Sequence, residues 1–254
     1  MRGLTFFPIP DLPEIRRGDD LVDLLLSALQ RADLTLAPHD VVVVSQKIVS
    51  KSEGRVVELA TVTPSAQALE LAQRCAKDPR LVELVLQEST RVVRCAKDVL
   101  IVRHRLGFVV ANAAIDQSNL PDSEGRALLL PRDPDASAAG LRKAISARAQ
   151  AEVGVLISDS FGRPWRLGVT GVCVGCAGIA SIYDARGRTD RNGRALQVTQ
   201  IAVADEICAT ATLVSGEANE GTPMVIVRGL ASTYFTQPRP AADLIRPTAE
   251  DLFR

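Results

Sequence analysis

The sequence predicts an α+β fold in which mixed or antiparallel sheets pack against helices. Apolar residues recur at helical spacing in several long segments, whereas short β-branched runs, such as the four valines at 41–44, are typical of buried strands. The two patterns do not alternate regularly, as they would in a doubly wound sheet. With 254 residues, 46% hydrophobic and 24% charged, the chain is long enough for one large domain or two smaller ones.

Each predicted helix has apolar positions three and four residues apart, and most begin near a capping residue. Ser65 is a candidate cap for one helix, and Asp135 or Ser137 lies near the cap of another. The predicted helices, in chain order, occupy residues 19–32, 65–76, 80–93, 134–149 and about 203–214.

The predicted strands are short apolar runs bounded by turn residues. Residues 99–114 are expected to form two strands around a turn near 105–107, and residues 120–137 form a long loop. The remaining strands begin at 41 and occupy 153–160, part of 195–202, and 223–230.

Charge and cysteine content exclude several classes of protein. Thirty basic and thirty acidic side chains give a net charge of 0, so nucleic acid is not an expected partner. Five cysteines do not suit a disulfide framework, and Cys173 and Cys176 are expected to be small buried residues because a second pair of metal ligands is missing. No apolar run approaches the ~18 residues of a membrane-spanning helix. A cytoplasmic protein is therefore expected.

Polar clusters follow two of the predicted strands. Gln46, Lys47 and Lys51 follow the valine run, and the two lysines share one side on either a helix or a strand. They fit either a strand edge made soluble by lysine or a site for an anion. Asp159 and Ser160 suit a Mg²⁺ or Mn²⁺ site, and the arginines at 163 and 166 suit an anionic substrate, although a capped, solvated turn is the alternative.

Two loops carry further acidic residues. Asp116 lies in ANAAIDQSNL with Asn119 nearby, which fits either an ordinary turn or a hard-cation site. Glu217 lies between two glycines in SGEANEGTP and is a third candidate metal ligand. The chain has only two histidines and no Walker motif. This set of residues suits metal-assisted phosphoryl transfer better than acid–base hydrolysis.

The same segments resemble the coenzyme F420-0:L-glutamate ligase family, also called F420 γ-glutamyl ligase. The similarity follows the family order from about residue 8 to 230, with Ser160 where family members often have threonine. The matching segments are LPEIRRGDDL, SQKIVSKSEGR, GFVVANAAIDQSNL, LPRDPDASA, ISDSFGRPWR, VTQIAVADEI and SGEANEGTPMVIVRGL.

The resemblance implies an unusual α+β fold, a homodimer, and one ligase region over residues 1–254, with two structural subdomains as an alternative. It implies no C-terminal flavin-reductase-like domain. The implied reaction joins L-glutamate through its amine to the carboxylate on the lactyl-phosphate side chain of the deazaflavin F420-0. It consumes GTP, passes through an acyl phosphate and can continue with a γ-linked glutamate. Mg²⁺ or Mn²⁺ is the expected metal, with a monovalent cation such as K⁺ as a further candidate.

Carried over by position, the family motifs imply three groups of site residues. The metal ligands are Asp116, Asp159, Ser160 and Glu217. The catalytic candidates are Asp159, Arg163 and Arg166. The nucleotide-contacting residues are Leu12, Pro13, Glu14, Ile15, Gln46, Lys47, Lys51, Asn119, Ser215, Gly216, Glu217, Ala218, Asn219, Glu220, Gly221 and Thr222.

Two other functions use the same residues. A metal-dependent phosphatase or nucleotide hydrolase would release phosphate without glutamate. A non-catalytic paralogue would bind a nucleotide or deazaflavin without turnover. The presence of all three carboxylates, at 116, 159 and 217, favours catalysis, because binding alone needs fewer acids beside a triphosphate.

Overall fold

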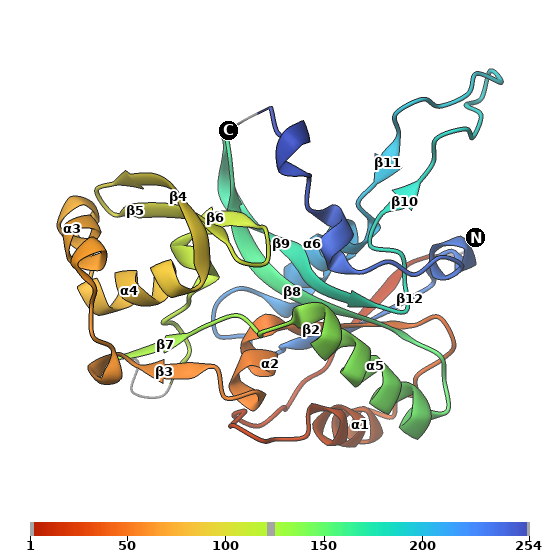
Figure 1. Ribbon diagram of the computed structural model, residues 1–254. Helices are drawn as coiled ribbons and strands as arrows, with labels where there is room; N and C mark the ends of the chain where they lie inside the picture. The colour runs from red at the N-terminus through yellow and green to blue at the C-terminus, as the bar shows by residue number, and fades with distance from the viewer. Residues whose placement is uncertain (1–2, 121–124, 253–254) are drawn as a thin grey trace.

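A five-stranded sheet lies at the centre of the larger of two lobes in the computed structural model, which describes residues 3–120 and 125–252 (Figure 1). Strands β2 and β8 are parallel and the other neighbours are antiparallel, which confirms the predicted mixed sheet. The strands, in sheet order, are β1 (Thr5–Pro8), β12 (Met224–Arg228), β2 (Val41–Ser45), β8 (Gly154–Arg163) and β9 (Arg166–Ala177).

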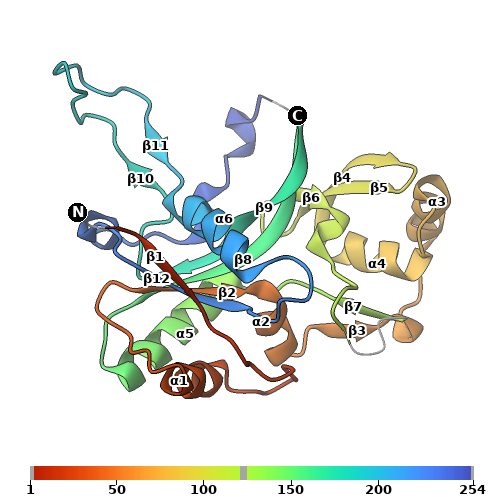
Figure 2. The same cartoon turned by 180° about the vertical axis from the view of Figure 1, so that it is seen from behind.

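Helices cover both faces of this sheet, because its central strands are apolar on both sides. The helices α1 (Leu21–Arg31) and α5 (Pro134–Ala149) lie on one face, and α6 (Val203–Ser215) lies on the other (Figures 1 and 2). Alternate valines of β2 enter the two cores: Val42 packs on the α1 side and Val43 on the α6 side.

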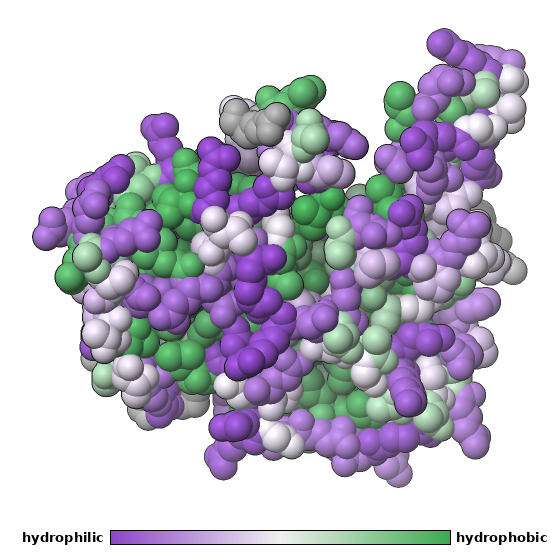
Figure 3. All heavy atoms as spheres, in the orientation of Figure 1, coloured by the Kyte–Doolittle hydropathy of each residue, from purple (hydrophilic) through white to green (hydrophobic). Residues whose placement is uncertain are grey.

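The small lobe has its own core, formed by a three-stranded sheet and two helices. A separate two-stranded ribbon, β10 (Tyr183–Asp184) with β11 (Gln200–Ile201), carries a projecting and mostly hydrophilic arm (Figure 3). The elements of the small lobe are α3 (Ala66–Cys75), α4 (Pro79–Gln87), β4 (Ser89–Ala96), β5 (Val99–His104), β6 (Val109–Ala111) and the β3–β7 ribbon (Val56–Glu58 with Arg126–Leu128).

Several predicted boundaries were wrong. The helix predicted over 80–93 ends at Gln87, because the β-branched residues that follow pair with β5 as a strand. Asp133, and not a later residue, caps α5 by accepting a hydrogen bond from the Ala136 N–H. The loop predicted over 120–137 contains β7 and the start of α5, and its residues 121–124 lie outside the described residues.

The remaining predictions for the core agree with the structure. The helix predicted at 19–32 is α1, capped by Asp20, and Ser65 caps α3 as expected. Cys173 and Cys176 are free and buried. Within residues 3–120 and 125–252, no helix has the length and apolar character needed to cross a membrane.

Candidate functional site

The polar segments singled out in the sequence leave the large sheet at one edge. The last residue of β2, Ser45, pairs with Ser158 of β8, so the residues after Ser45 and those from Asp159 onward in β8 lie at the same edge of the paired region. Strand β12 begins opposite Val44, and β1 ends opposite Val225. Residues 9–15, 46–52, 159–160 and 215–223 therefore gather around this edge, as parallel and antiparallel pairing requires.

The lysines lie on a helix, α2 (Gln46–Ser52), and not on a strand edge. Ser45 caps this helix, which turns Gln46 into the protein, where it is 1% exposed. The side-chain oxygen of Gln46, Oε1, accepts a hydrogen bond from Ser50 Oγ at 2.9 Å, while Nε2 of the same amide has no hydrogen-bond partner among the described residues. Lys51, one turn after Lys47, lies 2.6 Å from Glu14 Oε1.

Lys47 connects the two lobes at the site. Its Nζ lies 2.7 Å from Asp116 Oδ2 and donates to Ser118 Oγ at 2.8 Å. The Ser118 N–H donates to the other Asp116 oxygen at 2.7 Å. Burial raises the pKa of Asp116, but these hydrogen bonds outweigh it and leave the pKa below its usual value. Asp116 is therefore a carboxylate at neutral pH.

The backbone before Asp116 is strained. Three consecutive residues, Asn112, Ala113 and Ala114, have φ of 53°, 53° and 55°. Residues other than glycine rarely adopt this left-handed region, and three in sequence are costly. Strain of this kind is often found at functional sites, where the surrounding structure maintains it.

Asp159 faces the same region from strand β8. Burial raises its pKa to about 7, and the nearby Asp116 carboxylate adds to the rise, against opposing contributions from the Ser160 N–H and Lys47. The carboxyl groups of Asp116 and Asp159 therefore lie near each other, and the charge of Lys47 does not fully offset the repulsion between them. A divalent cation would supply that charge, since Mg²⁺ binds one or two carboxylates and takes its other ligands from water and phosphate. The donor set fits such a metal.

Ser160 and Glu217 form a second part of the site. Ser160 follows Asp159 on the strand, so its side chain leaves the opposite face. Its hydroxyl lies 2.7 and 2.9 Å from the two Glu217 carboxylate oxygens. Among the described residues, no three His, Cys, Asp or Glu side chains are grouped as a metal site. The structure therefore brings Asp116 and Asp159 together, with Glu217 tied to Ser160 beside them.

The loop after α6 is shaped by Glu220. Gly216 has a φ of 77°, and a Cβ on it would lie 2.1 Å from the Glu220 side chain, so only glycine fits there. Glu220 Oε2 accepts the Ala218 N–H at 2.8 Å, and Thr222 Oγ1 donates to the Ser215 carbonyl at 2.7 Å. This bonding folds the segment Ser215–Thr222 into a compact turn at the sheet edge.

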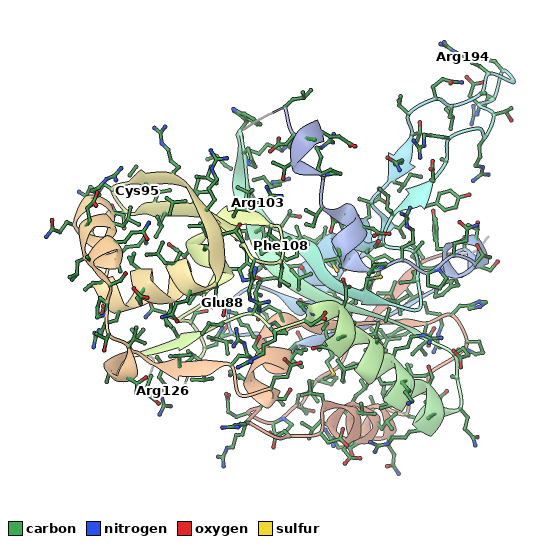
Figure 4. All side chains as sticks on the ribbon, in the orientation of Figure 1. Glu88, Cys95, Arg103, Phe108, Arg126 and Arg194 are labelled. Carbon is green, nitrogen blue, oxygen red and sulfur yellow. The ribbon has the colours of Figure 1, made fainter. Side chains whose placement is uncertain are left out.

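A cavity of about 170 Å³ lies beside Lys51 and contains arginines that were not predicted. Arg16 and Arg17 line it from the N-terminal loop, and Arg126 lines it from β7, within the segment predicted to be a loop (Figure 4). Arg16 and Arg17 lie in the matching segment LPEIRRGDDL but were not among the predicted site residues, and Arg126 lies outside every segment that was singled out. Ile15 of the predicted nucleotide set forms part of its wall, whereas Leu12 packs on the core and Asn119 is exposed.

Arg163 and Arg166 are not beside the acidic pair. Both are exposed at the end of the β8–β9 hairpin, where Arg163 Nη2 donates to the Leu167 carbonyl at 3.3 Å. Arg163 lies four positions after Asp159 on the strand, which is about 13 Å along the chain. The strand predicted over 153–160 was too short, because β8 continues to Arg163.

Comparison with known proteins gives a consistent result. The sequence model of the F420-0:Gamma-glutamyl ligase family matches residues 11–229. The coenzyme F420:L-glutamate ligase of Methanothermobacter thermautotrophicus is 42% identical over 252 residues, which is 99% of each chain. The proteins of the same name from Methanopyrus kandleri and Halobacterium salinarum are 41% and 46% identical, covering 99% and 87% of this chain and 98% and 85% of their own.

Proposed function

Because the chain belongs to the F420-0:gamma-glutamyl ligase family, we propose that it forms an amide between the carboxylate of coenzyme F420-0 and the amine of L-glutamate, with consumption of GTP. The observation that carries this proposal is the convergence of Lys47, Asp116 and Asp159 at one sheet edge in a chain that matches its relatives over nearly its whole length. The homodimer, the single ligase region, the cytoplasmic location and the second glutamate stay predictions.

The proposed reaction has two steps. The acceptor carboxylate attacks the γ-phosphorus of GTP and displaces GDP, which gives an acyl phosphate. The glutamate amine then attacks the acyl carbon, loses a proton and displaces phosphate, leaving the amide. Both steps need positioning and positive charge more than a strong nucleophile on the protein.

The residues at the sheet edge suit these requirements. Lys47 and Lys51 place two ammonium groups on one side of α2, where they would balance charge on phosphoryl oxygens. The buried amide of Gln46 interacts with the Asp159 carboxylate and would help to orient it. Asp116 and Asp159 would hold Mg²⁺ or Mn²⁺, which would supply further positive charge to the phosphates. Residues 12–15 and 215–222 would contact the nucleotide.

One set of incubations tests the function. Purified protein is mixed with F420-0, L-glutamate, GTP and Mg²⁺ or Mn²⁺, with each component omitted in turn, and the products are measured by mass spectrometry. A glutamate-sized mass increase that requires both GTP and glutamate is expected. GDP formed without glutamate would instead identify a nucleotide hydrolase, and ligand binding without any product would identify a non-catalytic paralogue.

Replacing Asp159 with Asn tests the acidic pair. The two side chains have the same shape, so the variant should fold, yet turnover should fall by at least about 100-fold because one metal-binding carboxylate is lost. Circular dichroism and a thermal melt serve as the control for folding. Full activity of Asp159→Asn would remove this residue from the metal site.

A further inference from the structure

The outer half of the β8–β9 hairpin stands apart from the rest of the sheet. Strand β2 pairs with β8 only as far as Ser158, so beyond that point β8 and β9 have only each other as strand partners within the described residues. Figure 1 shows this part as the teal ribbon that rises past β6. Phe161 anchors its base by packing edge-to-face against Phe108, with ring centroids 5.6 Å apart.

The end of the hairpin carries apolar and cationic side chains and no acid. Residues 160–171 contain two arginines and neither Asp nor Glu. Three large apolar side chains project from it: Trp165 is 82% exposed, Leu167 is 99% exposed and Val169 is 55% exposed. An aromatic ring between two arginines is an arrangement that suits a planar anionic ligand.

Trp165 also occupies an unfavourable backbone position. The turn runs Arg163–Pro164–Trp165–Arg166, and Trp165 has a φ of 58°. In a turn with proline at the second position, a third residue with positive φ is usually glycine or asparagine. A tryptophan there costs stability, and its side chain is largely exposed to solvent.

We propose that the end of this hairpin binds the acceptor, with Arg163 and Arg166 on its phosphodiester and Trp165 stacked on its deazaflavin ring. The inference rests on the proposed function and deepens it. The same strand carries Asp159 about 13 Å away, so a long acceptor could place its carboxylate at the acidic pair while its ring contacts the hairpin. Charge complementarity supports this occupant, since the acceptor is an anion with a planar ring.

The nucleotide is less suited to this position. The cavity lined by Arg16, Arg17 and Lys51 lies at the other end of the site, beside α2 and β3, and provides a separate cationic pocket (Figures 1 and 4). The predicted nucleotide-contacting residues Ile15 and Lys51 belong to that pocket. The two phosphate-bearing substrates would therefore approach Asp159 from different sides.

Fluorescence gives a direct test, because Trp165 is the single tryptophan of the 254 residues. Titration with F420-0 should quench Trp165 emission to saturation, whereas GTP and L-glutamate should leave it unchanged. A phosphate-free deazaflavin should quench at higher concentration, and Arg163→Gln or Arg166→Gln should weaken F420-0 but not this smaller ligand. Saturable quenching by GTP, or none by F420-0, would overturn the proposal.

Replacing Trp165 with Gly separates binding from folding. Glycine fits the positive φ, so thermal stability should be unchanged or higher, while the KM for F420-0 rises on the order of tenfold through loss of the stacked ring. The KM for GTP should stay the same. Val198→Ala, which removes an 85% exposed apolar side chain from the distant arm, is the matched control and should change neither constant.

Two results would reject the proposal while leaving the ligase function intact. One is an unchanged KM for F420-0 in Trp165→Gly. The other is a Trp165→Gly protein that loses activity and also has a smaller sedimentation coefficient than the wild type, because the hairpin would then pack on a second copy of the chain. Conversely, wild-type protein that binds F420-0 with quenching but forms no glutamate adduct would contradict the proposed function and still support the hairpin as a deazaflavin site.

Discussion

At the scale of single residues, the Ser160 hydroxyl holds the loop that carries Glu217. The hydroxyl contacts both carboxylate oxygens, and no other hydrogen bond to the Glu217 side chain is described. Ser160→Ala should therefore lower kcat by roughly tenfold or more, because Glu217 is no longer positioned. The side chain is only partly buried, so stability should change by less than about 1 kcal/mol.

The conservative variant makes this test specific. Ser160→Thr keeps the hydroxyl, with the same donor and acceptor groups, and should retain activity within about threefold. Steady-state kinetics at several Mg²⁺ concentrations would show whether the defect of Ser160→Ala is relieved by excess metal. Equal activity of the alanine variant and the wild type would exclude a role for the hydroxyl.

At the scale of secondary-structure elements, β9 is held between two helices by glycines. A Cβ on Gly175 would lie 2.3 Å from the Pro134 carbonyl oxygen at the start of α5, and one on Gly171 would lie 2.5 Å from the Cys208 carbonyl oxygen of α6. Backbone atoms cannot move away as a flexible side chain could. Both helices therefore approach the strand more closely than any other residue would allow.

Gly175→Ala should reduce the free energy of unfolding by about 1–3 kcal/mol, because overpacking forces the backbone of α5 away from the sheet. Gly140→Ala in the middle of α5 is the control, since nothing lies within 4 Å of its Cβ. That substitution should stabilise the protein by about 0.5–1 kcal/mol through helix propensity. Urea unfolding measures both, and a Gly175→Ala protein as stable as wild type would contradict the close packing.

The local patterns predicted most elements, and the errors have physical causes. α1 and α3 have amphipathic spacing and a capping residue in the sequence itself, so they were predictable. Strand β9 was not predictable from local patterns. Its small residues allow close contact with α5 and α6, and they have low strand propensity. The helix predicted over 80–93 was too long because pairing with β5 decides where α4 ends.

The same distinction applies to the site. Spacing alone showed that Lys47 and Lys51 share one side, and their place on α2 agrees with it. The approach of Lys47 to Asp116 joins residues from different lobes, so no local pattern contains it. The arginines of the cavity were missed for the same reason: Arg126 lines the same cavity as Arg17 only after the β3–β7 ribbon has formed.

At the scale of the whole molecule, Glu88 links the two lobes. It lies at the end of α4, where it accepts hydrogen bonds at 2.8 Å from Arg55 and from Arg105 (Figure 4). Those arginines in turn donate to the carbonyls of Leu130 and Arg132, at 2.8 and 2.7 Å, in the segment that leads into α5. The carboxylate therefore ties the small lobe to the large one.

This cluster predicts a pH dependence of stability. Burial raises the pKa of Glu88, but the nearby His104 and the hydrogen bonds from Arg55 and Arg105 outweigh it and hold the pKa at about 2, below the usual value of 4.5. A lowered pKa in the folded state means that the stabilisation is complete above pH 4.5 and is lost as the pH falls towards 2. The shift corresponds to about 3 kcal/mol for this largely buried group.

Glu88→Gln should therefore lower the free energy of unfolding at pH 7 by about 2–4 kcal/mol and flatten its dependence on pH between 4.5 and 2. The control is Glu70→Gln on α3, an exposed residue whose weak ion pair with Arg74 spans 3.6 Å. Its unfolding free energy should follow the wild-type curve. Urea titrations across this pH range would show the difference, and parallel curves for Glu88→Gln and wild type would exclude the link.

The same variant connects stability to the site. Lys47 belongs to the large lobe and Asp116 to the small lobe, so their 2.7 Å contact depends on the relative position of the lobes. If Glu88 maintains that position, Glu88→Gln should raise the metal concentration needed for half-maximal activity at pH 7, while Glu70→Gln should not. An unchanged metal requirement in a destabilised Glu88→Gln protein would show that the lobes keep their arrangement through the remaining contacts, and that Glu88 acts on stability alone.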